Sequence, residues 1–481
     1  MATIINYISR FLNMVFKPYI PKRVYVSKSA LSYPRTQQMI SRIKKLNRKV
    51  QIINLLTNTP PRPNLNGKAL YKNLKETIVI CTRSANYMEV FASPGKILEN
   101  LGLMGKIISH CPLRCLFCYL DVSGRGTPWT RVYVDLENFY IQAVQERLVY
   151  KMTLTLWSAI SFHLKKPLDK VPEKFKDICD NTIRREILRK RSVVTTDKAA
   201  IKYLKKHLRE FFLKMGIRIT HKQTAKLKRT IPDYYEKNAG NQLKINISEY
   251  SDVLGLDHIT HHMDELMQLV HNDRHFHIKF RTKTANIQNL LKYDGKNQLK
   301  VTFGINTDHV IKNYEKGTAS LTERIAAINA LGQRGGYEID LAIEPIIKYK
   351  GYESDYRALI KRIITDINLS DVANIKVGTV RYKTRLKNYI KSTHPNSGLI
   401  TRNQKLVAPQ KGDKRWRYSK DERIKIYSLI RDELKNVPSV KLGLGSENPE
   451  LWDALGLDKT NIHSDVVYQY TPEENDNSTN S

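Results

Sequence analysis

The stretch His110–Leu120, which reads HCPLRCLFCYL, contains three cysteines with the spacing C-x3-C-x2-C. Cys111, Cys115 and Cys118 are three of only five cysteines in the 481 residues. Iron–sulfur clusters are held by cysteine thiolates, usually four. A compact run of three therefore predicts a [4Fe–4S] cluster with one iron that has no protein ligand and is open to a substrate or cofactor.

Two other uses of these cysteines are less consistent with the sequence. A structural zinc site needs a fourth cysteine or histidine at finger spacing, and only His110 is near enough. A disulfide framework is disfavoured, because a long chain with five cysteines and no secretory signal is typical of a reducing compartment. We therefore expect a cytoplasmic protein with reduced thiols.

The charge of the chain indicates a polyanionic partner. Lys and Arg number 81 against 46 Asp and Glu, which gives a net charge of +35. Basic side chains that neutralise phosphates release condensed counterions, so nucleic acid is the first candidate and an anionic membrane surface the second. No run of about 18 apolar residues is present, so we expect no membrane span.

Strand-like and helix-like segments alternate after the cysteine motif, which predicts a parallel sheet with crossover helices and a complete or partial β/α barrel. Sites in such barrels lie at the carboxyl ends of the strands. Ser251, Lys283 and Asn306 lie at or just past such ends. The predicted strands are Ile78–Cys81, Arg131–Asp135, Leu243–Ser248, His277–Lys283, Leu299–Asn306, Tyr337–Ile343, Ile375–Arg381 and Val440–Leu444; a helix through Glu146 follows the second.

Two segments that do not follow this alternation of strands and helices are strongly basic. Residues 150–240 contain 23 Lys and Arg against 9 Asp and Glu, on helix-like pieces such as Ile183–Arg191 and Lys198–Lys214. They are either a solvated helical insertion or a nucleic-acid-binding module. Residues 386–440 interleave aromatic and basic residues, as in Lys414–Tyr418, a pattern suited to phosphates and bases.

Histidines are concentrated between His258 and His277, and His258, His261 and His262 have helical i, i+3, i+4 spacing. That spacing permits metal binding. Without a nearby cysteine or a well-placed carboxylate, we expect surface and packing roles instead.

Several blocks of the sequence together resemble the spore photoproduct lyase family of the radical S-adenosylmethionine superfamily. The cysteine spacing and the aromatic Phe117 before the third cysteine are similar to the superfamily as a whole. The blocks that are specific to the family are Tyr25–Pro34, Cys111–Leu120, Ser251–His258, Arg281–Lys283, Phe303–Asn306 and Val310–Glu315.

The resemblance implies an α/β fold, a partial (β/α) barrel of the radical S-adenosylmethionine type with an inserted basic helical segment and a basic C-terminal region. The expected divisions are residues 1–105 as an N-terminal region, 106–149 and 241–385 as the barrel, 150–240 as the insertion, 386–470 as a substrate- and DNA-binding region, and 471–481 as a disordered tail.

The implied activity is a lyase that reverses the ultraviolet lesion 5-thyminyl-5,6-dihydrothymine in DNA with a 5′-deoxyadenosyl radical. Its partners would be ultraviolet-damaged DNA and an electron donor such as flavodoxin or ferredoxin. The resemblance assigns the [4Fe–4S] cluster to the three motif cysteines, S-adenosylmethionine to Ser251, Lys283 and Asn306, the radical path to Tyr119, and the lesion pocket to Arg417 and Tyr418.

Glu249 departs from the family pattern, because the family has a hydrogen-donating cysteine at this position. A carboxyl O–H is a poor hydrogen-atom donor, so we expect Glu249 to accept a hydrogen bond from the amino group of S-adenosylmethionine. The returned hydrogen would then come from Tyr119, from deoxyadenosine, or from Cys179 or Cys81. Two alternatives stay open: a related enzyme with another nucleic-acid substrate, and a DNA-binding protein with a structural or redox cluster.

Overall fold

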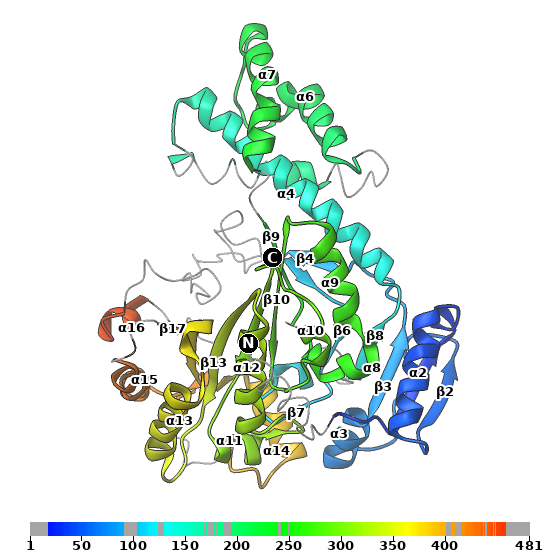
Figure 1. The fold of residues 1–481 in the computed structure, drawn as a ribbon, viewed down its shortest axis with the longest axis vertical. Helices are drawn as coiled ribbons and strands as arrows, with labels where there is room; N and C mark the ends of the chain where they lie inside the picture. Colours follow the sequence, from blue (N-terminus) through cyan, green and yellow to red (C-terminus); the bar gives the residue numbers. More distant parts are fainter. Residues whose placement is uncertain are drawn as a thin grey trace, which may run out of the picture.

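Two β-sheets form the body of the protein, and helices form a head that projects from it (Figure 1). No helix in the described part of the chain is long and apolar enough to cross a membrane. The computed structural model describes residues 18–90, 103–123, 129–167, 170–171, 175, 178, 181–185, 194–238, 242–248, 250–400, 406–408, 415–435, 437, 440–445, 447 and 449–457.

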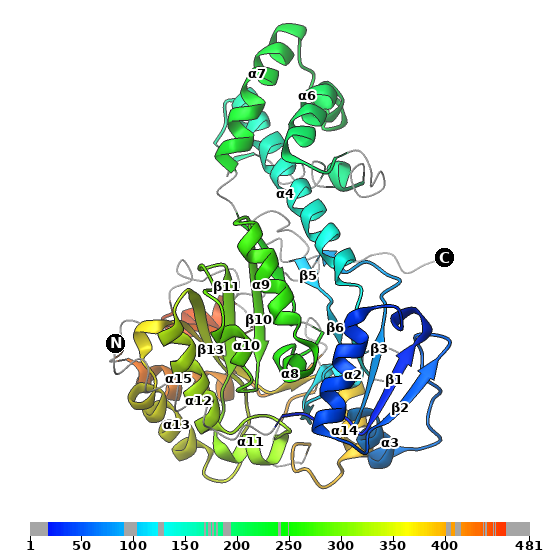
Figure 2. The same cartoon turned by 45° about the vertical axis from the view of Figure 1, so that its right-hand side comes forward.

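The first sheet has five strands in the order β2-β1-β3-β8-β6, and only β6 is antiparallel to its neighbour. Figure 2 shows helix α2 (Pro34–Leu46) lying across β1, β2 and β3. The buried strand β3 and strand β8 confirm two of the predicted strands. The strands are β1 (Arg23–Ser27), β2 (Gln51–Leu55), β3 (Thr77–Cys81), β6 (Ile108–Ser109) and β8 (Thr130–Tyr133).

The second sheet has eight strands in the order β17-β14-β13-β11-β10-β9-β5-β4, all parallel to their neighbours except β4. Its edge strands do not pair with each other, so the predicted partial barrel is confirmed. The strands are β4 (Met88–Val90), β5 (Leu103–Gly105), β9 (Leu243–Asn246), β10 (Phe276–Thr282), β11 (Leu299–Gly304), β13 (Tyr337–Ile346), β14 (Val372–Thr379) and β17 (Lys441–Leu444).

Helices follow most of these strands, as parallel crossover connections require, and α9 (His262–Asn272) and α12 (Leu321–Arg334) pack directly against β10 and β13. Figure 1 shows several of them along one face of the second sheet. The carboxyl ends of the neighbouring strands β10 and β11 meet at one edge, where Lys283 directly follows β10 and Asn306 lies two residues past β11. The helices are α8 (Asp257–Thr260), α9 (His262–Asn272), α10 (Gln288–Leu291), α11 (Asp308–Tyr314), α12 (Leu321–Arg334), α13 (Tyr352–Asp366), α14 (Thr384–Thr393), α15 (Lys420–Leu434) and α16 (Pro449–Ala454).

Helix α4 (Leu136–Leu164) joins the body to the head and is much longer than the predicted helix through Glu146. Its first turns pack Phe139 and Ala143 into the body, and its later turns pack Leu156 and Ile160 into a second core. We call residues 148–164, α6 (Asp197–Lys214) and α7 (His221–Lys237) the head. A helix of 29 residues is about 43 Å long, so it carries the head away from the body.

Partly buried contacts fix α4, α6 and α7 to one another. The carboxylate of Asp197 at the start of α6 lies 3.0 Å from Nη1 of Arg147 on α4. The same carboxylate accepts a 2.7 Å hydrogen bond from the Tyr235 hydroxyl on α7. The predicted helix Lys198–Lys214 is thus confirmed, and the predicted Ile183–Arg191 helix is described only over 181–185.

The sheets divide the chain differently from the predicted domain ranges. β4 and β5 lie before residue 106 but belong to the barrel sheet, whereas β6 and β8 lie after it and belong to the first sheet. β17, within the predicted C-terminal region, completes the barrel sheet. The predicted disordered tail, Cys179 and Glu249 lie outside the described residues.

Candidate cluster and cofactor site

Residues 110–118, here called the cysteine loop, lie between β6 and β8 of the first sheet. His110 leaves β6 with a φ of 62°, a left-handed conformation that turns the chain into the loop. The short strand β7 (Arg114–Cys115) then pairs antiparallel with β12 (Glu315–Lys316), which lies in the chain between β11 and β13 of the barrel sheet, with Cys115 opposite Glu315. The barrel therefore fixes the middle of the loop through backbone hydrogen bonds.

A buried ion pair fixes the loop from the other side. Nζ of Lys75, the last residue of α3 (Gly67–Lys75), donates a 2.9 Å hydrogen bond to the Cys111 carbonyl. The same nitrogen lies 2.6 Å from Oδ1 of Asp121, and both side chains are almost completely buried. An unpaired charge at this buried position would be costly, so Lys75 and Asp121 stay paired. Lys75 binds Cys111 near the start of the loop and Asp121 lies just past its end, so the pair holds the two ends together.

The three motif thiols lie in one small apolar cluster with Leu113 and Leu120. Burial raises the pKa of Cys111 to about 12 and that of Cys118 to about 11, and it raises the pKa of Cys115 well above its ordinary value. Charge on Cys118 raises the pKa of both other thiols further, so the three sulfurs lie within electrostatic range of one another.

The donor chemistry of the loop fits an iron–sulfur cluster better than a single ion. Among the described residues, no three or more Cys, His, Asp or Glu side chains are arranged to hold one metal ion. A cluster distributes its cysteine ligands over several irons, so these ligands need not converge on one point. Three neighbouring thiols are a suitable donor set for it, since cysteine binds metal as the thiolate.

Ser251, Asp252 and Lys283 lie against the cysteine loop at the carboxyl ends of β9 and β10. The Asp252 backbone donates a hydrogen bond to Cys111, and its carboxylate accepts one of 2.7 Å from the Lys283 backbone. The neighbouring Ser251 is 2% exposed, and its hydroxyl has no hydrogen-bond partner among the described residues. A buried hydroxyl without a partner is costly and indicates a ligand that completes it.

Lys283 belongs to a buried charge network that reaches the cysteine loop. Its Nζ lies 2.6 Å from Oε1 of Glu315, whose other oxygen lies 2.8 Å from Nη2 of Arg324. The Lys283 ammonium also lies 5.6 Å from the centroid of the Phe117 ring. Burial raises the pKa of Glu315, but Lys283 and Arg324 outweigh this effect and lower it overall, so Glu315 stays ionised.

Asn306 is at the same edge but is fully buried and bonded within the protein. Its Nδ2 donates a 2.8 Å hydrogen bond to the Pro345 carbonyl, and its Oδ1 accepts one of 2.9 Å from Tyr356. Lys283 Nζ donates to the adjacent Glu344 carbonyl at 3.0 Å. Asn306 therefore orders the end of β13 beside Lys283, and its contact with a cofactor stays a prediction.

Basic side chains surround Glu344 inside the mouth of the barrel. Arg281 Nη1 lies 3.0 Å and Lys376 Nζ 3.7 Å from Glu344 Oε2. Burial raises the pKa of Glu344, but Lys376, Arg281 and Arg381 lower it to about 2. With more cations than carboxylates, this part of the mouth is suited to an anionic ligand.

The remaining predicted site residues are at three different places. Tyr119 follows the cysteine loop and is 54% exposed. Arg417 pairs with Arg381 through β16 (Trp416–Arg417) and β15 (Arg381–Tyr382), and its Nη2 lies 2.5 Å from Glu447. Tyr418 is buried, and its hydroxyl accepts a 2.9 Å hydrogen bond from the Lys348 backbone.

The histidines and Cys81 have the packing roles that the sequence favours. His258 shares a 2.8 Å hydrogen bond with the Tyr19 carbonyl, and His261 pairs with Asp264 at 2.9 Å. His262 is fully buried. Cys81 is 0% exposed within β3, so it is a core residue and not an accessible thiol donor.

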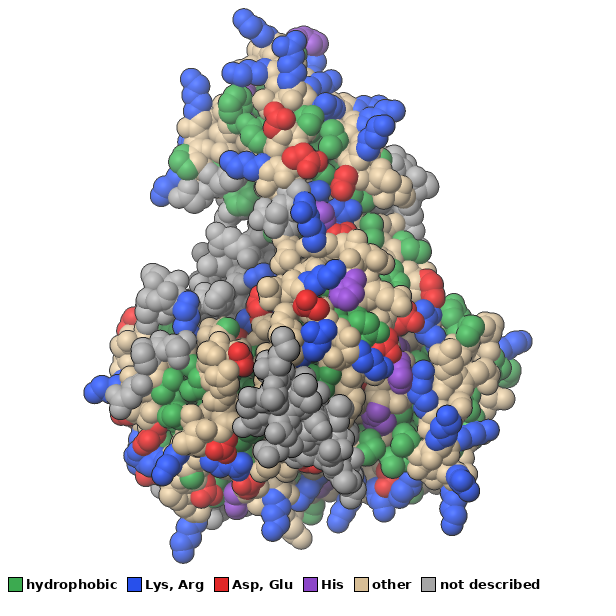
Figure 3. All heavy atoms as spheres, viewed as in Figure 1, with side chains coloured by type: hydrophobic (Ala, Val, Ile, Leu, Met, Phe, Trp, Pro, Cys, Tyr) green, Lys and Arg blue, Asp and Glu red, His purple; other side chains and the backbone are tan. Residues whose placement is uncertain are grey.

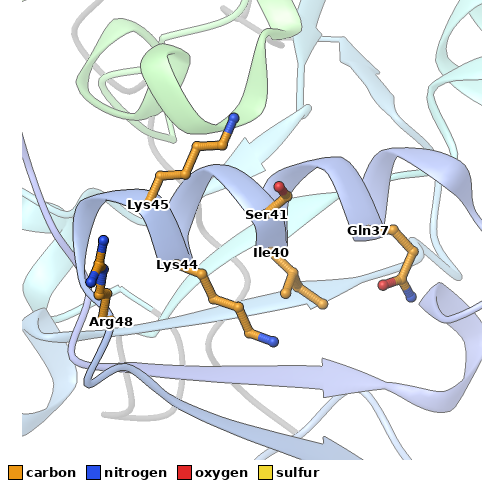
Figure 4. Close-up of a pocket in the computed structure, with 6 residues that line it drawn as sticks. All are labelled: Gln37, Ile40, Ser41, Lys44, Lys45 and Arg48. Atoms are coloured by element: carbon orange, nitrogen blue, oxygen red, sulfur yellow. The ribbon is translucent and has the colours of Figure 1, made fainter.

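A hollow of about 530 Å³ lies on helix α2, away from the cysteine loop. Figure 4 shows the side chains of Lys44 and Lys45 pointing away from one another, so they do not converge on one anion. The hollow is therefore not part of the candidate site. Its lining residues are Gln37, Ile40, Ser41, Lys44, Lys45 and Arg48.

Sequence reasoning missed the charged residues that support the loop. Glu315 and Asp252 occur in the family-like blocks but received no role, and Lys75, Asp121 and Arg324 received none either. Their functions depend on contacts between distant segments. The one local signal was the capping box Ser320–Glu323, which fixes the start of α12 and so places Arg324 one residue later.

Comparison with known proteins shows the family of this chain. The family model described as spore photoproduct lyase matches residues 19–198 and 214–442. The spore photoproduct lyase of Geobacillus sp. (strain Y412MC61) is 20% identical over 387 residues, which cover 80% of this chain and 85% of the relative. That of Bacillus subtilis (strain 168) is 23% identical over 358 residues, which cover 72% and 73%.

Solved structures have the same fold. A spore photoproduct lyase complexed with dinucleoside spore photoproduct has a TM-score of 0.59 and 19% identity, covering 89% of this chain and 99% of the other. A mutant with bound AdoMet and the dinucleoside has a TM-score of 0.60 with the same identity and coverage. Because the family model matches most of the residues, including all three loop cysteines and Lys283, this chain belongs to the spore photoproduct lyase family.

Proposed function

We propose that this protein is a DNA-repair lyase that reverses 5-thyminyl-5,6-dihydrothymine by radical chemistry. The observation that carries the proposal is the cysteine loop, held by buried charges beside the unpartnered Ser251 hydroxyl and the Lys283 ammonium. Family membership supports it, as do related structures with bound AdoMet and dinucleoside spore photoproduct.

Cys111, Cys115 and Cys118 would hold a [4Fe–4S] cluster, and Ser251, Lys283 and Asn306 would contact S-adenosylmethionine. Reduced by a flavodoxin or ferredoxin, the cluster and this cofactor would supply a 5′-deoxyadenosyl radical. The Ser251 hydroxyl would donate the hydrogen bond that it lacks in the described structure. Lys283, whose Nζ lies 2.6 Å from Glu315, would supply positive charge to the carboxylate of the cofactor.

The reaction removes the hydrogen from C6 of the lesion, breaks the bond between the two thymines and returns one hydrogen to the methylene carbon that is released. The chain's part is to hold the dinucleotide in place meanwhile. Arg417 and Tyr418 would border the lesion, and the cations around Glu344 would hold its phosphate. A damaged base pair is less costly to extrude from the duplex than an intact one.

Glu249 gives a prediction that separates cofactor binding from hydrogen return. If its carboxylate binds the amino group of S-adenosylmethionine, Glu249→Gln weakens cofactor affinity roughly tenfold, as expected for the loss of a charge-assisted hydrogen bond of about 1.5 kcal/mol. Glu249→Cys restores the thiol of the family and improves clean conversion to two thymines. Isothermal titration of the cofactor and product chromatography measure the two effects. Unchanged affinity in Glu249→Gln would remove this role from Glu249.

The proposed activity is tested by anaerobic reconstitution, reduction and assay on a dinucleotide that contains the lesion. We expect loss of the lesion and formation of thymine only when S-adenosylmethionine is present. Deoxyadenosine without loss of the lesion would instead favour an enzyme of this family with another nucleic-acid substrate, as Glu249 suggests. A cluster without any cleavage of S-adenosylmethionine would favour a structural or redox role on DNA.

A further inference from the structure

The head has a strongly basic surface that the candidate site does not use. Within residues 194–238, eleven Lys and Arg side chains are exposed, against three Asp and Glu. Figure 3 shows Lys and Arg side chains projecting from the top and sides of the head. The family match is interrupted at residues 199–213, so most of α6 lies outside the part shared with the family.

The charges on α6 form one stripe. Lys198, Lys202, Lys206 and Arg209 have the spacing i, i+4, i+8 and i+11, which places them on one helix face. Nη1 of Arg209 and Nε2 of His221 are 3.4 Å apart, so the stripe continues to Lys222 on α7. We call Lys198, Lys202, Lys206, Arg209 and Lys222 the head stripe.

The opposite face of α6 is occupied by the core of the head. Ala200, Leu204, Leu208 and Phe211 are buried there against α4 and α7. Within the described chain, Lys198, Lys202, Lys206 and Lys222 form no ion pairs. An interfacial membrane helix inserts its apolar face among lipids, and α6 has that face already buried. The stripe is therefore complementary to phosphates and not to a lipid interior.

The head stripe and the cysteine loop lie at opposite ends of the molecule. Both ribbon views place α6 and α7 at one end of the long axis and α3 and α11 near the other (Figures 1 and 2). α3 ends at Lys75, which binds the loop, and α11 leads directly into Glu315. A dinucleotide at the loop cannot reach the head, whereas a long duplex can.

We propose that the head stripe is a second DNA-binding surface, which holds the phosphate backbone of duplex DNA independently of sequence and away from the reacting lesion. This inference rests on the proposed function for the identity of the polyanion. It adds that the enzyme contacts long DNA at two distant places, so the head contributes to affinity but not to the chemical step.

The test compares two full-length quadruple variants with wild type. The head variant carries Lys198→Gln, Lys202→Gln, Lys206→Gln and Lys222→Gln. The control carries Lys296→Gln, Lys361→Gln, Lys435→Gln and Lys441→Gln, four exposed lysines of the body with the same total charge change. Affinity for an undamaged duplex long enough to span the molecule is measured by fluorescence anisotropy over a range of salt concentrations, alongside turnover of the lesion dinucleotide.

We expect the log–log salt dependence of the head variant to become shallower by about 0.9 for each lysine that contacts a phosphate. The control should change it less, and dinucleotide turnover should be unchanged in the head variant. Equal salt slopes for DNA binding in the head variant and the control would overturn the proposal. It would also be overturned if the head variant lost binding to phosphatidylserine vesicles but kept its affinity for DNA. If wild type does not convert the dinucleotide, the proposed function fails, and the comparison of salt slopes still decides the role of the head.

Discussion

Replacement of Cys115 by alanine is expected to abolish both iron binding and cleavage of S-adenosylmethionine. Cys115 is at the centre of the cysteine loop, paired with Glu315 of the barrel. In the proposed cluster, three thiolates would already leave one iron without a protein ligand, so two would not retain a stable [4Fe–4S] cluster. Iron and sulfide analysis, electron paramagnetic resonance of the reduced protein and deoxyadenosine formation measure the loss.

Cys81→Ala is the matched control for this prediction. Cys81 is also a buried cysteine, but it lies in β3 of the first sheet, outside the cysteine loop. Its replacement should lower stability slightly and leave the full iron content and the cleavage rate unchanged. A Cys115→Ala protein with a complete cluster and the wild-type rate of deoxyadenosine formation would contradict the assignment of the ligands.

Replacement of Arg324 by methionine is expected to lower the free energy of unfolding by about 3–5 kcal/mol, the usual cost of breaking a buried ion pair. Arg324 is fully buried, and its guanidinium donates to the Gly304 carbonyl at 2.6 Å and to Glu315 at 2.8 Å. Without it, those acceptors lose their partner, and only Lys283 offsets the buried charge of Glu315. Urea unfolding followed by circular dichroism measures the change.

Arg362→Met provides the comparison at the surface. Arg362 lies 3.0 Å from Asp366, four residues later on α13, and both side chains are partly exposed. Such a pair contributes less than about 1 kcal/mol, because water and salt screen it. Equal losses in the two variants would show that burial of the Arg324 network does not decide its contribution.

Most of the barrel was predictable because six of its eight strands are local signals, whereas the short strands β4 and β5 were not predicted. β10, β11, β13 and β17 all overlap predicted strands, since buried parallel strands read as short apolar runs between helices. β2, an edge strand, was not among the predicted strands, although its residues Ile52, Ile53 and Leu55 are apolar. The length of α4 was underestimated because this helix is buried on several sides, so its pattern shows no single apolar face.

The candidate site was also predictable only in part. The three cysteines are close in sequence, so their spacing alone indicated a cluster. The Lys283–Glu315–Arg324 network joins β10, β12 and α12 and exists only after the barrel has formed. The head was recognised as basic and helical, but its position at the end of the molecule opposite the cysteine loop depends on the direction of α4.

The most direct test of the proposed mechanism uses the lesion dinucleotide with deuterium at C6, incubated anaerobically with the reduced, reconstituted protein and S-adenosylmethionine. We predict that deuterium appears in the adenosyl group, in 5′-deoxyadenosine or recovered cofactor, while two thymines form. Unlabelled 5′-deoxyadenosine together with an unchanged amount of lesion would contradict the proposed reaction.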